Sequence, residues 1–265
     1  MYWYSYVMGT AGVYTSAHLL FDFINTPNHL CLHQWTPQAS TSVSPIATSS
    51  PPAALASSGL LQSAFLAAGA KVSALDINPS KLTLTHERLH IAKADITSES
   101  ELESAFEEAR LKFGVIQCCV ALASLDLSVL PHVSLIDIAA EQWRRTFQVN
   151  VEGTFLTAPT WLRQIKAHAT PETRNLSLVI ICSESGWFGE RTNADYASGK
   201  SAVQIGLVQS LQNDIMRIHP GARVNAVAPG PVDTAQFKKE CKENPIGAGI
   251  SGIRGALTFE AGKAA

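Results

Sequence analysis

Short apolar runs alternate with longer amphipathic stretches along the chain from about residue 53 to residue 238. The apolar runs are nonpolar on both faces, as parallel strands covered on both sides must be. The stretches between them have the spacing of helices that pack on a core. The alternation predicts an α/β fold, a doubly wound parallel sheet of the Rossmann-like type. The predicted strands are Val72–Leu75, Leu89–Ala92, Val115–Ala121, Leu178–Cys182 and Val224–Val227.

Three long helices are predicted between these strands. Ser98 and Glu101 form a capping box that opens a helix running to Lys112. A helix over about 141–167 is expected to kink at Pro159, because proline lacks the backbone N–H that the helix needs. A third helix over about 194–218 ends at the sequence HPGA.

The two ends of the chain lack this pattern. Residues 1–35 have no period of 2 or 3.6, and residues 36–52 (TPQASTSVSPIATSSPP) are rich in Ser, Thr and Pro. We therefore expect an irregular N-terminal extension and linker over 1–52, a Rossmann-like core over 53–238 and a divergent tail over 239–265. The sheet is expected to be incomplete at its first and last strands, since PIATSS is a poor parallel strand.

Composition narrows the class of protein. Of the 265 residues, 46% are hydrophobic and 16% charged, and the net charge of −2 gives no basic face for nucleic acid. Five cysteines without a CxxC pair favour a reduced, cytoplasmic protein. The aromatic N-terminus has no basic region and is interrupted by polar residues, so neither a signal peptide nor a membrane span is expected. His29, Cys31 and His33 share one face of an extended segment, but no second ligand cluster accompanies them, and no metal site is expected.

The candidate chemistry is concentrated in the sequence YASGK. Tyr196 and Lys200 are four residues apart, so they project from one face of a helix. An ammonium beside a phenol lowers the pKa of the phenol, which can then exchange a proton with a substrate oxygen. Such a pair alone also fits two surface neighbours. The context favours chemistry, because Ser183 ends an apolar strand thirteen residues earlier, at the sheet edge where open α/β folds bind ligands.

Two further features fit the same edge. Asn150 lies inside a predicted helix, where asparagine is unfavourable without a specific partner, although a purely structural helix asparagine remains an alternative. RVNAVAPGPVDT is a buried strand followed by the turn Pro229-Gly230-Pro231, which is also compatible with an ordinary strand exit.

Taken together, VNVEGTF, ICSESG, YASGK and RVNAVAPGPVDT resemble the short-chain dehydrogenase/reductase family in order and spacing, over about residues 55–238. The resemblance implies that Tyr196 is the catalytic acid/base, that Lys200 lowers its pKa and binds the nicotinamide ribose, and that Ser183 polarises the substrate carbonyl. It also implies that Asn150 holds a water for a proton relay. GWFGE (186–190) falls where the family's substrate-lining residues lie.

The same resemblance implies NAD as the cofactor. Asp76 would bind the adenosine ribose, which disfavours the 2′-phosphate of NADP, and Asp95 would lie beside the adenine. The residues that the resemblance implies for binding the nicotinamide end are Tyr196, Lys200, Pro229, Gly230, Val232 and Thr234. The substrate would be a small alcohol or carbonyl compound, with no nucleic acid or membrane partner. The family commonly dimerises through its two long helices, so a homodimer or homotetramer is expected.

Three departures from the family pattern qualify this reading. Pro52, Ala56 and Ser58 occupy the positions of the glycines in the family's T-G-x-x-x-G-x-G loop, and Pro51 and Pro52 remove backbone N–H donors for a pyrophosphate. Leu122-Ala123-Ser124 replaces the family's N-A-G, and no last strand is recognisable after Thr234.

The leading hypothesis is an NAD(P)-dependent oxidoreductase acting on a secondary alcohol, polyol or ketone. The alternative is a catalytically inactive relative that serves as a binding or assembly module.

Overall fold

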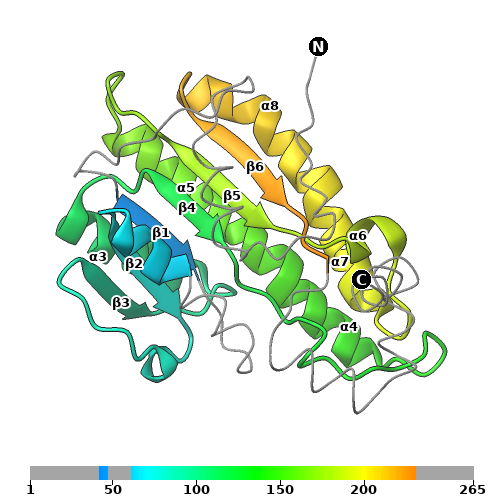
Figure 1. Ribbon diagram of the computed structural model, residues 1–265. Coiled ribbons are helices and arrows are strands. Elements are labelled where there is room, and N and C mark those ends of the chain that lie inside the picture. Colours follow the sequence, from blue (N-terminus) through cyan, green and yellow to red (C-terminus); the bar gives the residue numbers. More distant parts are fainter. Residues whose placement is uncertain (1–41, 47–60, 231–265) are drawn as a thin grey trace, which may run out of the picture.

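Six parallel strands form one sheet in the order β3-β2-β1-β4-β5-β6 in the computed structural model, which describes residues 42–46 and 61–230 (Figure 1). From β1 the chain adds β2 and β3 on one side, then crosses back to add β4, β5 and β6 on the other. The strand order therefore reverses between β1 and β4, which is the position where doubly wound sheets bind ligands. The strands are β1 Ser42–Ile46, β2 Lys71–Asp76, β3 Leu89–Lys93, β4 Cys118–Ala121, β5 Ser177–Ile181 and β6 Arg223–Val227.

The doubly wound parallel sheet predicted from the sequence is confirmed, and five strands lie where the apolar runs indicate. β4 begins three residues later than expected, at Cys118. The reason is that Ile116 directs its backbone bonds to helix side chains instead of the sheet. Its N–H donates to Gln164 Oε1 at 2.6 Å, and its carbonyl accepts from Trp161 Nε1 at 2.9 Å.

The expectation of a missing first strand is wrong for residues 42–46. β1 lies in the middle of the sheet, with Val43 in register with Val72 of β2 and with Cys118 of β4. Without β1, those two neighbours would face each other with unpaired backbone groups, and a ladder of backbone bonds depends little on side-chain type. Pro45 supplies no donor to this ladder, which is why the sequence reads poorly as a central strand. The expected lack of a last strand and the expected divergent tail over 239–265 concern residues outside the described part of the chain.

Helices cover both faces of the sheet. Residues 61–67 are helical and pack against β2, β4 and β5 on one face. On the opposite face, helices α3, α5 and α8 share a core with the sheet, in which Trp161 and Ile165 are fully buried. The described helical elements are η1 Pro79–Lys81, α3 Glu99–Phe113, α4 Ala140–Phe147, η2 Gln148–Gly153, α5 Thr154–His168, α6 Ser185–Phe188, α7 Ala194–Ser201, η3 Ala202–Leu207 and α8 Val208–Ile218.

The two longest predicted helices each contain a wide π-helical segment that the sequence did not indicate. One is η2, between α4 and α5, and the other is η3, between α7 and α8. Pro159 lies inside α5, beyond η2. Both π segments border the loops at the carboxyl edge of the sheet, and π-helical turns are frequent at functional sites.

The helix predicted from the capping box is α3, and half of the box is present. Ser98 Oγ accepts from Glu101 N–H at 3.3 Å, as expected. The Glu101 carboxylate accepts instead from Asp95 N–H at 3.0 Å. It therefore fixes the turn between β3 and α3 instead of closing the box.

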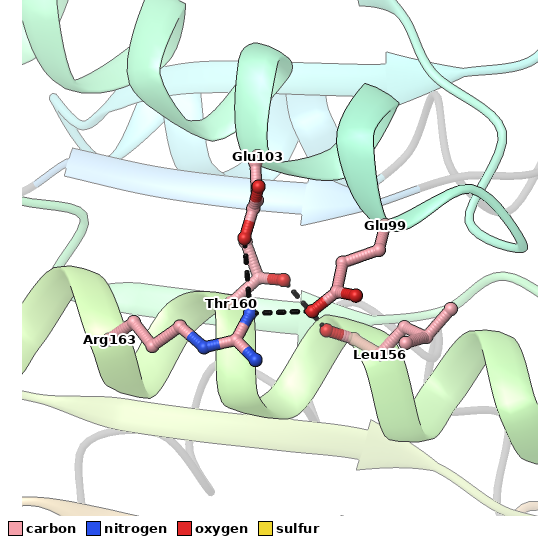
Figure 2. A network of polar contacts seen from close by, with 5 residues as sticks. All are labelled: Glu99, Glu103, Leu156, Thr160 and Arg163. Atoms are coloured by element: carbon pink, nitrogen blue, oxygen red, sulfur yellow. Dashed lines mark hydrogen bonds and ion pairs between the residues drawn. The ribbon is translucent and has the colours of Figure 1, made fainter.

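An exposed ionic network joins α3 to α5 on the outside of the molecule (Figure 2). Arg163 Nη1 lies 2.8 Å from Glu99 Oε1 and 3.1 Å from Glu103 Oε1. All three side chains are at least half exposed, so water screens the pairs and their contribution to stability is small. The buried face of the same two helices holds them together.

Candidate active site

Tyr196 and Ser183 meet at the carboxyl edge of the sheet. Ser183 follows β5 by two residues, and Tyr196 lies in the first turn of α7. The Tyr196 phenol lies close enough to the Ser183 side chain for that side chain to affect the Tyr196 pKa, and both residues are buried. Ser183 Oγ also accepts from Ser185 N–H at 3.2 Å. That acceptance leaves the Ser183 hydroxyl proton available for donation to another oxygen.

Lys200 reaches the same place from one turn further along the helix. Its Nζ lies 5.7 Å from the centroid of the Tyr196 ring and donates to the Ile181 carbonyl at 2.9 Å. The side chain is 4% exposed. Burial lowers the pKa of Lys200, and the nearby Cys182 and Asp126 oppose that shift. The sequence YASGK therefore does place the phenol and the ammonium on one buried face.

The pKa of Tyr196 shifts in the direction opposite to the expectation from the sequence. It is raised, chiefly because burial disfavours the phenolate, while the hydrogen bond from Ser183 lowers it and the carboxylates of Asp126 and Glu190 raise it further. The expected lowering by Lys200 does not prevail, because desolvation is the largest effect. In this arrangement Tyr196 is a protonated phenol and can donate a proton.

Asn150 has the specific partner that its place in a helix requires. Asn150 Oδ1 accepts from Leu125 N–H at 2.7 Å, and its Nδ2 donates to the Leu125 carbonyl at 2.9 Å. Asn150 lies within η2 and is 1% exposed. A Cβ placed on Gly199 would lie 3.8 Å from the Asn150 Cβ, so Asn150 packs behind the residue next to Lys200. Asn150 thus holds the loop after β4, which lacks the family's N-A-G.

Asp195, which no sequence motif singles out, fixes the start of α7. Its Oδ2 accepts from Thr146 Oγ1 at 2.8 Å and from Gln142 Nε2 at 3.2 Å, both on α4. Asp195 is completely buried and adjacent to Tyr196. A carboxylate in the first turn also suits the positive end of a helix dipole. The only sequence signal for it is an acid at a helix start, which is too common to single out.

The expected cofactor residues lie at separate strand ends. Asp76 ends β2 and is fully buried, and its Oδ1 accepts from Asn78 N–H at 2.7 Å. Asp95 Oδ1 accepts from Thr97 N–H at 2.8 Å and from Thr97 Oγ1 at 2.7 Å. The Asp95 carboxylate therefore already organises the turn before α3.

Pro229 and Gly230 lie beside the exit from β5. The Pro229 carbonyl accepts from Glu184 N–H at 3.1 Å, and a Cβ on Gly230 would lie 2.9 Å from Glu184 Oε2. The pKa of Glu184 is raised by burial and by Glu190. Val232, Thr234 and the altered loop over 51–58 lie outside the described residues, as do His29, Cys31 and His33.

Two other kinds of site are absent from the part of the chain that the structure describes. Over residues 42–46 and 61–230, no group of three His, Cys, Asp or Glu side chains could hold a metal ion. In the same part of the chain, no helix has the length and apolar character needed to cross a bilayer.

Comparison with known proteins agrees with the fold. The family model of short chain dehydrogenases matches residues 60–245. This chain therefore belongs to the short-chain dehydrogenase family. An uncharacterized oxidoreductase of Staphylococcus aureus (strain USA300) is 28% identical over 176 residues, which are 63% of this chain and 69% of that protein. An uncharacterized oxidoreductase of Staphylococcus epidermidis is 28% identical over 174 residues, with the same shares of both chains.

A solved structure supports the fold independently. The crystal structure of a short-chain dehydrogenase/reductase, titled glucose/ribitol dehydrogenase, from Brucella melitensis superimposes with a TM-score of 0.63 at 22% identity. The match covers 77% of this chain and 79% of that one. Family membership and the oxidoreductase relatives support an oxidoreductase, and nothing among them points to a noncatalytic module.

Proposed function

We propose that the protein is an NAD(P)-dependent oxidoreductase that interconverts a secondary alcohol or polyol and the corresponding ketone. The observation that carries this proposal is the buried Tyr196 phenol close to the Ser183 hydroxyl, with the Lys200 ammonium beside the phenol ring. A substrate oxygen next to this pair would be within reach of two hydroxyl donors, the arrangement needed for proton transfer to an oxygen.

Each residue has a distinct task in this proposal. In reduction, the Tyr196 hydroxyl gives its proton to the carbonyl oxygen, and in oxidation the phenolate takes the proton back. Ser183 donates its hydroxyl proton to the same oxygen, since its Oγ accepts from Ser185 N–H. Lys200 stabilises negative charge that develops on the phenol. Asn150 keeps the loop after β4 in place, and by the family resemblance it would also hold a water for a proton relay.

The chemistry of the donors fits a nicotinamide cofactor. When bound, the nicotinamide supplies or accepts the hydride. Tyr196, Lys200, Pro229 and Gly230 would hold that end, together with Val232 and Thr234. Lys200 Nζ is an ammonium donor suited to ribose hydroxyls, although it is now bonded to the Ile181 carbonyl.

At the adenosine end, Asp76 offers a carboxylate acceptor for ribose hydroxyls, which favours NAD over NADP. Asp76 is fully buried, so a ribose can reach it only after covering groups move aside. Asp95 would lie beside the adenine.

The affinity of this chain for NAD should be low compared with that of other members of the family, because the loop over 51–58 is altered. Pro51 and Pro52 have no N–H to donate to a pyrophosphate. Losing two or three charge-assisted hydrogen bonds, at about 1.5–3 kcal/mol each, weakens binding by about two orders of magnitude or more. The two ends of the cofactor would still be held.

We also propose that the protein is cytoplasmic, that it forms a homo-oligomer and that it acts on small molecules. The three cysteines within the described residues, Cys118, Cys119 and Cys182, are free and buried, which agrees with a reducing compartment. Assembly through the long helices is usual in the family, and a homodimer or homotetramer is proposed on that ground.

The proposal is tested by calorimetry and turnover on the purified chain. NADH and NADPH are titrated separately, and a panel of ketones and secondary alcohols is assayed by nicotinamide absorbance at saturating cofactor. We expect weak NADH binding, weaker NADPH binding and turnover of at least one member of the panel. A variant carrying T-G-x-x-x-G-x-G over 51–58 should bind NADH much more tightly. Failure of every substrate with both the natural chain and the graft would overturn the proposal.

A further inference from the structure

Gln204 is a buried amide that contacts the candidate active site. It lies in η3, four residues beyond Lys200, and is 1% exposed. With its amide oriented to bond at both ends, Nε2 donates to the Ser183 carbonyl at 2.9 Å and Oε1 accepts from Trp187 Nε1 at 3.0 Å. A buried amide normally has such partners, but here one partner is the backbone of a proposed catalytic residue.

Three side chains from one helical surface reach the exit of β5. Tyr196 lies close to the Ser183 side chain, Lys200 donates to the Ile181 carbonyl and Gln204 donates to the Ser183 carbonyl. They are spaced four residues apart, so they follow one face of α7 and η3. The family resemblance accounts for the first two, whereas the glutamine continues the row by one more turn.

The segment after Ser183 is shaped to receive this amide. A Cβ placed on Gly186 would lie 2.6 Å from Gln204 Cδ, so any side chain at 186 would displace the amide. Trp187, the next residue, is 43% exposed although its indole N–H is bonded to Gln204. One edge of the indole is therefore fixed in the interior, while the rest of the ring stays accessible. In Figure 1, α6, which carries Trp187, lies against α7.

We infer that Gln204 is a positioning residue, which holds the Ser183 backbone and the Trp187 indole in one fixed arrangement so that Trp187 forms a rigid apolar wall of the substrate site. The inference rests on the proposed function. Ser183 is useful only where its hydroxyl points at the substrate oxygen, and small misplacements of such a group reduce rates strongly. A fixed indole beside it favours substrates with an apolar or CH-rich face.

The test compares three variants of the full chain. Gln204→Met keeps length and burial but removes both hydrogen bonds. Gln212→Met is the matched control, because Gln212 lies on α8 and donates to the Val224 carbonyl at 3.0 Å. Gln204→Glu replaces the amide by a carboxyl group. When protonated, this group can donate to the Ser183 carbonyl and accept from the indole N–H, whereas its ionised form can only accept, so it keeps the indole bond but repels the Ser183 carbonyl.

For Gln204→Met we expect kcat/KM to fall about tenfold to a hundredfold, with kcat falling as well as KM rising. Gln212→Met should stay within about twofold of the natural chain. The activity of Gln204→Glu relative to the natural chain should fall as pH rises through the pKa of the new carboxyl group, which burial raises. A merely structural glutamine would give no such pH-dependent ratio.

The indole N–H resonance of Trp187, assigned with Trp187→Phe, gives a readout that does not need turnover. In ¹⁵N-labelled protein, this N–H should shift and exchange faster with solvent in Gln204→Met but not in Gln212→Met. An inactive natural chain would defeat the proposed function, while this resonance would still report on Gln204. Either of two results would overturn the inference even in an active enzyme. One is an unchanged Trp187 resonance in Gln204→Met, and the other is an activity of Gln204→Glu, relative to the natural chain, that does not change with pH.

Discussion

Replacing Tyr196 with phenylalanine removes one oxygen atom and leaves the packing of the ring intact. The ring is buried in a small cluster with Leu125 and Leu130, and phenylalanine keeps those contacts. The hydroxyl interacts with the Ser183 side chain, and the loss of one such interaction costs at most about 1 kcal/mol of folding stability. The melting temperature should therefore change little, and any large loss of activity must come from chemistry.

The expected loss of activity follows from the role of the phenol as proton donor. General acid–base catalysis contributes about 10²–10⁴ in rate, so Tyr196→Phe should lower kcat by about that factor. Because burial raises the Tyr196 pKa, the phenol stays protonated up to and beyond its ordinary pKa of about 10. Reduction by the natural enzyme should accordingly show no alkaline decline at neutral to mildly basic pH. Oxidation, which needs the phenolate, should accelerate about tenfold per pH unit over the same range.

The assay is steady-state nicotinamide absorbance in both directions, with NADH affinity measured by calorimetry for each variant. Tyr196→Phe should bind NADH about as well as the natural chain, since the lost group acts on the substrate. Ser183→Ala is the companion variant, and the double variant should lose little more than Tyr196→Phe alone, because the two hydroxyls act on one oxygen. A Tyr196→Phe enzyme with more than about a tenth of natural turnover would refute the assignment of the proton donor.

Three more outcomes test the fold around the site. Asn150→Ala leaves the backbone N–H and carbonyl of Leu125 without their partner, so the free energy of unfolding in urea should fall by about 2–4 kcal/mol, whereas Asn213→Ala on the exposed face of α8 should change little. Burial raises the pKa of Cys118 from 9.0 to about 12, so the unfolded chain loses this proton first, and folding stability should fall by about 4 kcal/mol in total between pH 9 and pH 12. Urea denaturation at several alkaline pH values should show that the free energy of unfolding declines less with pH in Cys118→Ala than in the natural chain. An equal decline would contradict the assignment of this pH dependence to the Cys118 thiol. Deleting residues 1–46 removes the central strand β1, so we expect the cooperative thermal transition to be lost, and an unchanged transition would show that β1 contributes little.

The sequence was most informative where local pattern and tertiary role agree. Buried parallel strands need apolar residues on both faces, so β2, β3, β5 and β6 could be read directly from composition. The four-residue spacing of Tyr196 and Lys200 likewise fixed their common helical face. Each of these features depends on neighbours within one element, which a single sequence records.

The first strand and the ionisation of Tyr196 could not be predicted in the same way. Ser42–Ile46 is a strand because β2 and β4 offer it unpaired backbone groups on both sides, and its own side chains indicate this only weakly. The Tyr196 pKa depends on how completely the folded chain excludes water, and burial outweighs the effect expected of Lys200. A local motif contains no information about the desolvation of its own side chains.

By itself, the sequence determined the doubly wound sheet and the face on which the tyrosine and the lysine lie. Only the tertiary structure decided that Asn150 bonds to Leu125 and that Gln204 joins Ser183 to Trp187. The physical reason is how far apart in the sequence the interacting residues lie. Helix faces and strand burial follow from residues a few positions apart, whereas these hydrogen bonds link segments about twenty residues apart, and they form only when packing brings their donors and acceptors within about 3 Å.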